Sequence, residues 1–513
     1  MPLSRSVLAT FALLTAALVA LVGCSSDGGG HAATATVTRT PRATASATPT
    51  ASPTTTSSAT HTPTSTPDDE LPAGEDNGAQ GLNPFNNPAH VVPVEVCKDE
   101  LIASDQSLVL RVLPRGPIAP DGSLAFTSGA CVYLPPGYAG SNLRYPVLYL
   151  LHGGGGDQGD WVTYGGIRSI MDDLIDADPT NAAIVVMPDG RDAQWYDSLD
   201  GSIQNQTYVL DYVIPYVDRH FRTIATRGGR AIDGLSNGGY GAMHLAAKAP
   251  DRFVAAGGMS SNLAALTFAG LGTPGGIYYY GNLPAALAGN LDGVDLTLDI
   301  GTICLTDQMR DNCLAWRFEQ IFVPANRDFV NALNQVRGPD DGVLEYRETE
   351  GGHSWNWWPL WLRERHLPFL LARLGDPDPG DLPPAPAAPR TGFRYRSIAP
   401  QFSVWGYQVI VDRAVREFLD LFDVRPDGLR VQGSGEARIR TAALYVPRSD
   451  YTVSGAAVAD QHVRADADGH LTFTVDLGPS HQYDQYTKEA NALEQAGGYW
   501  TVRDILVSEE DAS

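Results

Sequence analysis

The sequence predicts an α/β protein with a mostly parallel sheet flanked by helices, followed by a small all-β, sandwich-like domain. Two patterns carry this prediction. Up to about residue 374, short runs rich in Val, Ile, Leu and Ala alternate with stretches of helical period, which is typical of a parallel sheet covered on both faces. After Arg390, apolar and polar residues alternate with a period near two, which predicts antiparallel strands.

The elements of the α/β part follow one another in a regular order. Apolar runs too short for helices predict buried strands at residues 145–151, 182–187, 230–236 and 253–261, and two later strands at 294–301 and 343–351. Helical periodicity predicts helices at 167–177, 208–221 and 238–249. In the C-terminal part, strands are predicted within 437–446, 470–477 and 499–507.

Two breaks in composition predict the domain organisation. Residues 24–82 are largely Thr, Ser, Pro, Ala and Gly, so they cannot bury enough apolar surface to offset the entropy of ordering and should form a disordered tether. Residues 375–390 form a proline-rich linker. We therefore expect an α/β domain at 83–374 and a β-rich accessory domain at 391–513.

The N-terminus predicts export. An apolar run from Val7 to Val22 follows a single arginine, and it is too short and too lightly flanked for a confident membrane span. The following LVGC, ending at Cys24, resembles the lipobox of bacterial lipoproteins. The resemblance implies that residues 1–23 are a signal peptide and that a lipid on Cys24 anchors the protein to the cell envelope, as its only contact with a membrane. The alternative is an ordinary signal peptide with an incidental cysteine.

Charge and cysteine content exclude some classes of partner. The chain has 59 Asp and Glu against 36 Lys and Arg, a formal charge of −23, and no basic cluster, which argues against binding nucleic acid. After Cys24, four cysteines remain in an oxidising compartment, where three pairings are possible. We favour two disulfides, Cys304–Cys313, which are close in sequence, and Cys97–Cys131.

No metal site is predicted. The cysteines show no metal-ligand spacing. The DADG stretch at Asp466–Gly469 could suggest a calcium loop, but it lacks the further ligands of a calcium hand, and a hairpin turn explains it.

Ser236 is the candidate nucleophile. It lies in the GLSNG of residues 234–238, a GxSxG pattern that alone is weak in a chain with 53 glycines. Here, however, the pattern follows a predicted strand and opens a predicted helix, which is the setting of a nucleophile elbow. The flanking glycines allow a sharp turn that exposes the serine oxygen at the helix N-terminus.

His353 is the candidate base. A serine hydroxyl is a poor nucleophile unless a base removes its proton. His353 lies in a glycine-flanked loop directly after a predicted strand, where such folds place their chemistry. His220, His244 and His366 lie in helical patterns and are expected to be packing or surface residues.

A glycine-rich loop, LLHGGGGDQGDW at residues 150–161, is the candidate oxyanion hole. It follows a predicted strand and is similar to the HGGG-type loop of esterases. The backbone amides of Gly154 and Asn237 are the expected donors. A phosphate-binding loop is the alternative, but no lysine follows as a P-loop requires.

Together these motifs resemble the esterase D, feruloyl esterase and mycolyltransferase-like group of the α/β-hydrolase superfamily. The resemblance covers about residues 131–374 and includes PDG at 188–190, the HGGGG loop, GLSNGGYGAM and GGHSWNWW. It implies an α/β-hydrolase fold and a triad in the chain order Ser, acid, His, which agrees with Ser236 before His353.

Two residues are candidates for the acid. Many members of this group place an Asp in a GTxD arrangement after a strand, but this chain has Cys304 at that position, which leaves Asp307 as the nearby aspartate. The stretch FEQIFVPANRDF resembles the mycolyltransferase segment in which the acid is a Glu, so we favour Glu319. The alternative is that Glu319 is a surface glutamate that pairs with a neighbouring arginine and has no catalytic role.

These residues predict a serine carboxylic-ester hydrolase that acts through an acyl-enzyme and needs no cofactor. Its substrate would be a small-molecule, glycan-linked or lipid-linked ester, and Trp355 and Trp161 are candidates for lining the acyl or aryl pocket. The alternative is acyl transfer to a sugar or glycolipid, as in a mycolyltransferase. A catalytically inactive domain used for binding is a third hypothesis, which the complete set of catalytic motifs disfavours.

Overall fold

The computed structural model describes residue 97, residues 106–112, 114 and 116, and the ranges 129–191, 193–265, 268–304, 313–338, 341–377 and 390–510. Cys24, the predicted signal peptide and tether, and Asp307 lie outside the described residues. Within those residues, no helix has the length and apolar content needed to cross a membrane.

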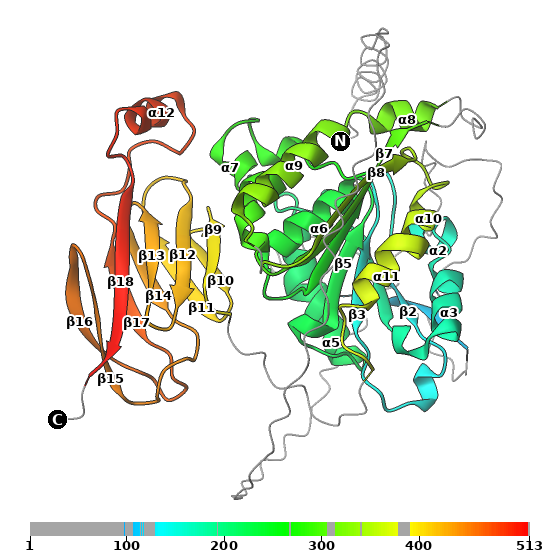
Figure 1. The fold of residues 1–513 in the computed structure, drawn as a ribbon, viewed down its shortest axis with the longest axis horizontal. Coiled ribbons are helices and arrows are strands. Elements are labelled where there is room, and N and C mark those ends of the chain that lie inside the picture. The colour runs from blue at the N-terminus through cyan, green and yellow to red at the C-terminus, as the bar shows by residue number, and fades with distance from the viewer. Residues whose placement is uncertain are drawn as a thin grey trace, which may run out of the picture. The chain divides into compact units, whose positions relative to one another are not determined.

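Eight described strands form one sheet in the order β1-β2-β4-β3-β5-β6-β7-β8 (Figure 1). The strands β3 to β8 run parallel, while β2 pairs antiparallel with both β1 and β4. This confirms the predicted mostly parallel sheet. The bounds are β1 Leu108–Val112, β2 Ala130–Leu134, β3 Val147–Leu151, β4 Ile184–Pro188, β5 Arg230–Gly234, β6 Ala255–Met259, β7 Asp295–Ile303 and β8 Leu344–Glu350.

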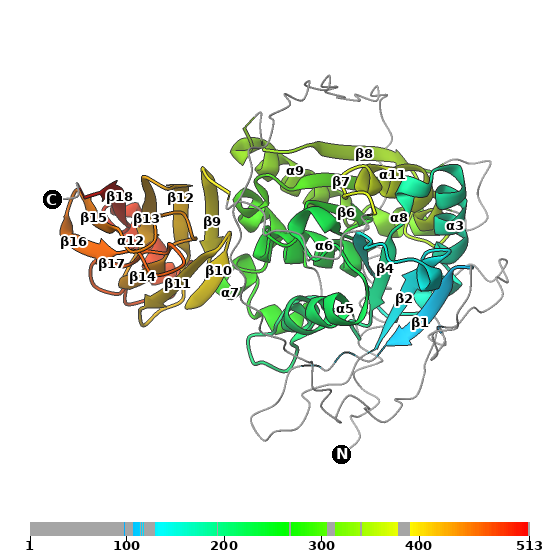
Figure 2. The same ribbon diagram turned by 90° about the horizontal axis from the view of Figure 1, so that it is seen from below.

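Helices cover both faces of this sheet, with α2, α3, α10 and α11 on one face and α5, α6 and α9 on the other (Figures 1 and 2). The α-helices are α2 Asp160–Thr163, α3 Ile167–Ala177, α4 Asn205–Thr207, α5 Ile214–His220, α6 Asn237–Lys248, α7 Ile277–Tyr280, α8 Leu314–Glu319, α9 Val323–Val336, α10 Trp358–Trp361 and α11 Leu367–Leu371. Two π-helical segments, η3 Tyr208–Val213 and η8 Leu362–His366, precede α5 and α11, and 3-10 segments are η1 Tyr138–Gly140, η2 Pro179–Asn181, η4 Arg227–Gly229, η5 Ala269–Leu271 and η6 Pro284–Leu291.

The central strands are apolar along their whole length because helices cover both of their faces. All five residues of β3, VLYLL, are 0% exposed, and the core cluster that they join takes in β4, β5 and α6. Such strands read as continuous apolar runs in the sequence, which is why they could be predicted without alternation.

The C-terminal part contains two antiparallel sheets, of four strands (β10-β11-β14-β17) and six strands (β16-β15-β18-β13-β12-β9) among the described residues. Both sheets contribute to one apolar core, for example Val409 and Ile439 from one and Leu421 and Val431 from the other, so the predicted sandwich is confirmed. The bounds are β9 Phe393–Ser397, β10 Gln401–Val404, β11 Tyr407–Asp412, β12 Leu419–Arg425, β13 Gly428–Gly433, β14 Glu436–Arg440, β15 Asp450–Gly455, β16 Val458–Arg464, β17 Thr472–Asp476, α12 Lys488–Gln495 and β18 Thr501–Glu509.

One strand of this part is shorter than its sequence pattern predicts. Alternation continues through residues 437–446, but β14 ends at Arg440. The next residue, Thr441, still donates its N–H to the carbonyl oxygen of Leu471 at 2.9 Å. Its hydroxyl donates to the carbonyl oxygen of Ala442 and accepts the N–H of Leu471, so side-chain bonds join the backbone pairing where the strand ends.

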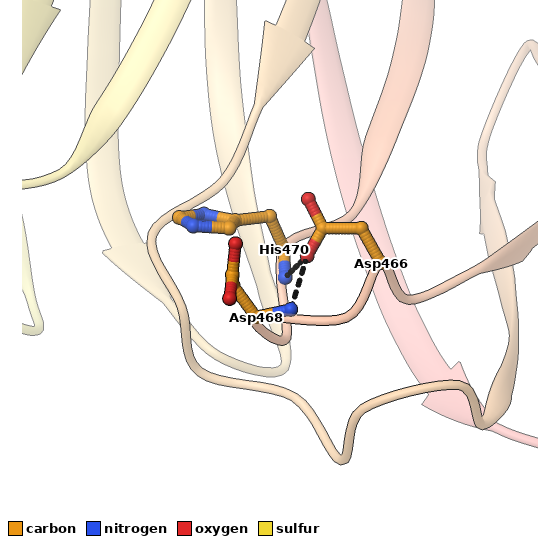
Figure 3. Close-up of side chains that lie close together, drawn as sticks. All are labelled: Asp466, Asp468 and His470. Carbon is orange, nitrogen blue, oxygen red and sulfur yellow. Dashed lines mark hydrogen bonds between the residues drawn. The ribbon is translucent and has the colours of Figure 1, made fainter. Parts of the chain in front are cut away.

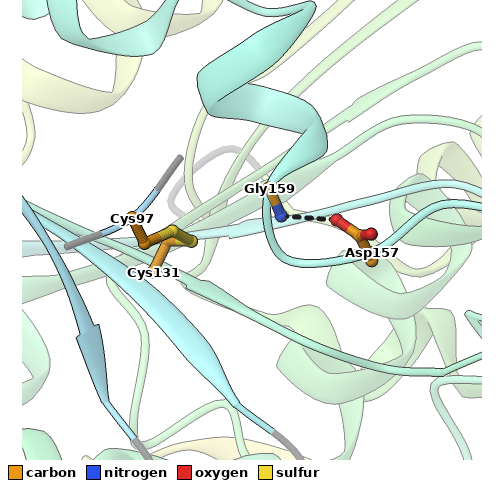
Figure 4. Close-up of a disulfide and its surroundings, with 4 residues drawn as sticks. All are labelled: Cys97, Cys131, Asp157 and Gly159. Atoms are coloured by element: carbon orange, nitrogen blue, oxygen red, sulfur yellow. Dashed lines mark hydrogen bonds between the residues drawn. A yellow bond between two sulfur atoms is a disulfide. The ribbon is translucent and has the colours of Figure 1, made fainter. Parts of the chain in front are cut away.

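Both predicted disulfides are present. The Cα atoms of Cys97 and Cys131 are 5.7 Å apart, and those of Cys304 and Cys313 are 6.0 Å apart. The first bond ties β2 to the chain before β1 (Figure 4). The second joins the residue after β7 to the residue before α8.

The DADG stretch forms a turn between β16 and β17 (Figure 3). These strands belong to different sheets, so the turn connects the two sheets and is not the predicted hairpin turn. Asp466 Oδ1 accepts the backbone N–H groups of Asp468 and His470 at 2.9 and 3.0 Å, and Asp466 Oδ2 accepts from Arg440. The carboxylate of Asp466 is therefore engaged by its own turn and by an arginine, and we assign no ion to it.

Candidate active site

Ser236 lies on the turn between β5 and α6, in a strained backbone conformation with φ 55° and ψ −117°. Two close backbone approaches explain its glycine neighbours. A Cβ on Gly234 would lie 2.4 Å from the carbonyl of Gly238, and a Cβ on Gly238 would lie 2.4 Å from the carbonyl oxygen of Leu151. Only glycine fits at both positions, so the sequence pattern produces the tight strand–turn–helix geometry of an elbow.

The loop after β8 brings His353 to this serine. His353 Nε2 lies 2.9 Å from Ser236 Oγ, although the two residues are 117 positions apart in sequence. The imidazole is 1% exposed and is enclosed by the rings of Phe318, Phe322 and Trp358, whose centroids lie 4.9 to 5.1 Å away. Packing on these faces holds the ring in one orientation.

Glu319, the last residue of α8, completes the constellation. Its Oε2 lies 2.8 Å from His353 Nδ1, and its side chain is 0% exposed. A carboxylate can only accept, so Nδ1 carries the proton and Nε2 is free to accept the hydroxyl proton of Ser236. The structure thus brings together Ser236, His353 and Glu319, and the competing candidate Asp307 lies outside the described residues.

Backbone contacts hold α8 against the histidine loop. The N–H of His353 donates to the carbonyl oxygen of Ala315 at 3.0 Å. A Cβ on Gly352 would lie 2.6 Å from the backbone nitrogen of Trp316, so the glycine before His353 permits a direct backbone approach to the helix.

The two residues predicted to supply the oxyanion donors lie close together at the elbow. Gly154, after β3, lies so close to Asn237 that a Cβ on it would meet Asn237 Nδ2 at 2.9 Å. Among the described residues, the backbone N–H groups of Gly154 and Asn237 donate no hydrogen bond to another group of the protein. Donors that bind a substrate oxygen should be available in this way.

Polar contacts shape the glycine-rich loop around these donors. Gly190 donates its N–H to His152 Nε2 at 2.9 Å, which leaves Nδ1 as the donor to the carbonyl oxygen of Gly153. Further along, Asp157 Oδ1 accepts the N–H of Gly159 at 2.7 Å (Figure 4). Burial raises the pKa of Asp160, at the end of the loop, to about 7.

The two tryptophans predicted to line a pocket differ in position. Trp161 is 0% exposed, its indole N–H donates to the carbonyl oxygen of Leu151 at 3.1 Å, and its ring packs edge-on against Trp355. Trp161 thus lies in the core beside Trp355, and its contact with a substrate stays a prediction. Trp355 is 8% exposed and packs edge-on against Trp358, whose ring contacts His353.

The other histidines hold packing or surface positions, as predicted. His244 is buried and stacks on Tyr240, while His220 is exposed and stacks on Tyr216. His366 is buried and forms hydrogen bonds with two aspartates. The helical periodicity of its segment does not indicate these partners.

Sequence reasoning missed Ser260, which follows β6 and donates its hydroxyl to Glu319 Oε1 at 2.7 Å. Its position after a predicted parallel strand was the available signal, since the ends of such strands meet at one edge of the sheet. The N–H of Gly301, in β7, donates to the same Oε1 at 2.9 Å.

Several known proteins are similar in sequence to this part of the chain. Residues 127–369 match the Esterase family model. Esterase Rv1288 of Mycobacterium tuberculosis is 37% identical over 264 residues, which cover 45% of this chain and 53% of that protein. The Endo-1,4-beta-xylanase/feruloyl esterase of Xylanibacter ruminicola is 36% identical over 131 residues, 24% of this chain and 18% of that protein. The chain thus spans about half the length of Esterase Rv1288 and less of the second relative.

Solved structures with a similar chain trace include a ferulic acid esterase, at 23% identity and a TM-score of 0.43, which covers 53% of this chain and 100% of that chain. MPT51 (FbpC1) of Mycobacterium tuberculosis is 22% identical with a TM-score of 0.39, covering 51% of this chain and 97% of that chain.

A mostly parallel sheet with a serine on the tight turn between β5 and α6 defines an α/β-hydrolase fold. Within that class, residues 127–369 of the chain match the Esterase family model and are similar in sequence to the esterases named above.

Proposed function

We propose that this protein is a serine carboxylic-ester hydrolase in which Ser236 is the nucleophile, His353 the base and Glu319 the acid. The observation that carries the proposal is the unbroken hydrogen-bonded series from Ser236 Oγ through His353 to Glu319 Oε2, at 2.9 and 2.8 Å. The three side chains are almost completely enclosed, so no bulk water competes for these bonds.

The reaction would proceed in two halves. Ser236 Oγ attacks the ester carbonyl carbon while its proton passes to His353 Nε2, and the proton then goes to the departing alcohol as the C–O bond breaks. A water molecule, deprotonated by His353, attacks the acyl-enzyme, and the acid leaves as Ser236 regains its proton. Glu319 keeps the histidine in the Nδ1–H tautomer and stabilises the imidazolium.

The amides of Gly154 and Asn237 would stabilise the oxyanion of each tetrahedral intermediate. Asn237 is the first residue of α6, so the positive end of that helix adds to the stabilisation. This scheme uses only groups of the protein and the substrate.

The test is hydrolysis of short- and medium-chain p-nitrophenyl esters by the purified protein and by Ser236→Ala. We expect Ser236→Ala to lower kcat by several orders of magnitude and to abolish labelling by a fluorophosphonate. Ser169→Ala is the matched control, because Ser169 is exposed and its hydroxyl donates only to the carbonyl oxygen of Gly166. Equal turnover by Ser236→Ala and the parent would refute the proposal.

Acyl transfer to a sugar or glycolipid is the second candidate. The observation in its favour is the identity of the acid, because a glutamate in this segment resembles the mycolyltransferase pattern. Product analysis with an added sugar acceptor separates the two reactions: more acylated acceptor than free acid would favour transfer over hydrolysis.

We also propose that residues 83–374 form the esterase domain, that residues 391–513 are an accessory domain, and that lipid on Cys24 holds both at the cell envelope. Feruloyl and acetyl esterases among the relatives support a small-molecule or glycan-linked ester as substrate. Metabolic labelling with a clickable fatty acid, in the parent and in Cys24→Ala, tests the anchor.

A further inference from the structure

We propose that Ser260 is a positioning residue of the esterase site, which fixes the carboxylate of Glu319 through a hydroxyl that Trp358 orients. The inference rests on the proposed function, because it assigns a further role within the same triad. Among the described residues, the hydroxyl of Ser260 bonds to Glu319 and Trp358 and not to Ser236, so its effect would pass through Glu319.

The direction of the hydrogen bonds follows from the chemistry of the three groups. Trp358 Nε1 lies 2.9 Å from Ser260 Oγ, and Ser260 Oγ lies 2.7 Å from Glu319 Oε1. An indole N–H can only donate and a carboxylate can only accept. The hydroxyl of Ser260 therefore accepts from Trp358 and must direct its single proton to Glu319.

Ser260 has a backbone conformation that is unfavourable for serine, so the surrounding contacts must hold it in place. Its φ is 50°, in the left-handed region that non-glycine residues rarely adopt, and the side chain is 0% exposed. Such a conformation is unfavourable for a residue with a Cβ and persists only where the surroundings determine it. Here the N–H of Ser260 donates to the carbonyl oxygen of Asp299 at 2.9 Å, which ties the residue to β7.

Ser260 and Gly301 together determine which way the carboxylate of Glu319 faces. Both donate to Oε1, so Oε2 is left to accept from His353. Gly301 belongs to β7 and Ser260 follows β6. Donors from two neighbouring strands therefore bind the carboxylate of Glu319, which is the last residue of the short helix α8. Loss of one donor would leave the carboxylate free to rotate about its last bond.

Trp358 connects this arrangement to the base. Its ring lies 5.1 Å from the imidazole of His353 at an interplanar angle of 86°, while its N–H holds Ser260. One side chain thus contacts the base directly and reaches the acid through a single hydroxyl. A small displacement of α10 would therefore move His353 directly and Glu319 through Ser260.

The neighbouring residue offers a matched control. Ser261 is also 0% exposed, and its hydroxyl has no hydrogen-bond partner in the described part of the chain. Replacing either serine by alanine removes one oxygen from the same region of the core. Only the change at Ser260 removes a donor to Glu319.

The experiment compares kcat, KM and melting temperature for Ser260→Ala, Ser261→Ala and the parent on the same p-nitrophenyl ester. We expect Ser260→Ala to lower kcat by about 10- to 100-fold with little change in KM, and Ser261→Ala to stay within about threefold of the parent. Trp358→Phe, which keeps an aromatic ring of smaller size and loses the donor, should lower kcat by a smaller factor.

A double-mutant cycle with Glu319→Gln separates positioning from general damage to the core. If Ser260 acts through the carboxylate, Ser260→Ala should add less than about twofold to the loss in Glu319→Gln, because the carboxylate that Ser260 orients toward His353 is already absent. Multiplying losses would overturn the proposal. If Ser260→Ala does not fold, Ser260→Gly serves instead, since glycine accepts the positive φ and also lacks the hydroxyl.

The controls distinguish this proposal from the one on which it rests. Activity retained in Ser236→Ala or Glu319→Gln would refute the triad and the role of Ser260 with it. Loss of activity in both of those variants, together with equal kcat for Ser260→Ala and Ser261→Ala, would refute only the role of Ser260.

Discussion

His366 Nδ1 lies 2.9 Å from Asp233 Oδ2, and both side chains are completely buried beneath the elbow. Asp233 precedes Ser236 by three residues in β5. On its other side, His366 Nε2 lies 3.2 Å from Asp299 Oδ2, so one imidazole bridges β5 and β7. Burial alone would lower the pKa of His366, but the attraction and hydrogen bonds of the two carboxylates outweigh it and raise the pKa to about 9.

This bridge predicts stability that falls as the solution becomes alkaline. The pKa in the folded protein is above that of an unfolded histidine, so the contribution is complete below about pH 6.5 and is lost as the pH rises through about 9. Melting temperatures measured from pH 6 to 10 should fall over that interval. His366→Gln should melt lower at pH 6 and show a flatter profile, whereas the exposed control His220→Gln should keep the parent's slope.

The acid assignment predicts a large effect of a small change. Glu319→Gln keeps the shape of the side chain but removes the charge that stabilises the imidazolium, so kcat should fall by about 10³- to 10⁴-fold. Glu319→Asp, one methylene shorter, should retain part of the activity. Glu350→Gln, exposed at the end of β8, is the control. Parent-like kinetics for Glu319→Gln would redirect the search for the acid to Asp307.

The close approach at the elbow predicts that Gly238→Ala is damaging. The new Cβ would lie 2.4 Å from the carbonyl oxygen of Leu151, so either β3 or the elbow must move. We expect kcat/KM to fall by at least about tenfold and the melting temperature to fall as well. Gly228→Ala is the control, because no atom lies within 4 Å of its Cβ position. Similar behaviour of the two variants would contradict the close backbone approach as the reason for glycine at position 238.

The second disulfide should influence catalysis more than the first. The Cys304–Cys313 bond fixes the start of the helix whose last residue is Glu319. Serine at both positions should lower kcat severalfold with a smaller change in KM. Serine at Cys97 and Cys131 should mainly lower the melting temperature, because that bond joins residues outside the site. The reverse ranking of the two effects on kcat would show that the tie to α8 has no part in positioning the acid.

Much of this molecule could be predicted from its sequence. The strands of the α/β part are buried on both faces and therefore appear as apolar runs, and Ser236 lies in a local pattern whose two glycines are required by close backbone contacts at the turn. His353 was identified by a similar local signal, a glycine-flanked loop after a strand.

The features that could not be predicted depend on what packs together in space. Ser260 contacts Glu319 across 59 residues of sequence, and nothing near either residue in the chain specifies the partner. Trp161 packs edge-on against Trp355 in the core, and the sequence around a tryptophan does not specify such a ring partner. The C-terminal strands alternate regularly, yet β14 ends at Arg440, next to a threonine whose hydroxyl accepts the N–H of Leu471, 30 positions further along the chain.

The edge strand β8 has a consequence for the behaviour of the protein at high concentration. Its sequence, LEYRETE, is at least partly exposed throughout, and its side chains form ion pairs such as Arg327–Glu348. If a second chain paired with this strand and extended the sheet, it would bury these charged groups and remove the water that solvates them. The strand therefore opposes edge-to-edge aggregation through its glutamates and through Arg347. Acidification would remove the part of this protection that the ionised glutamates supply, while the arginine keeps its charge.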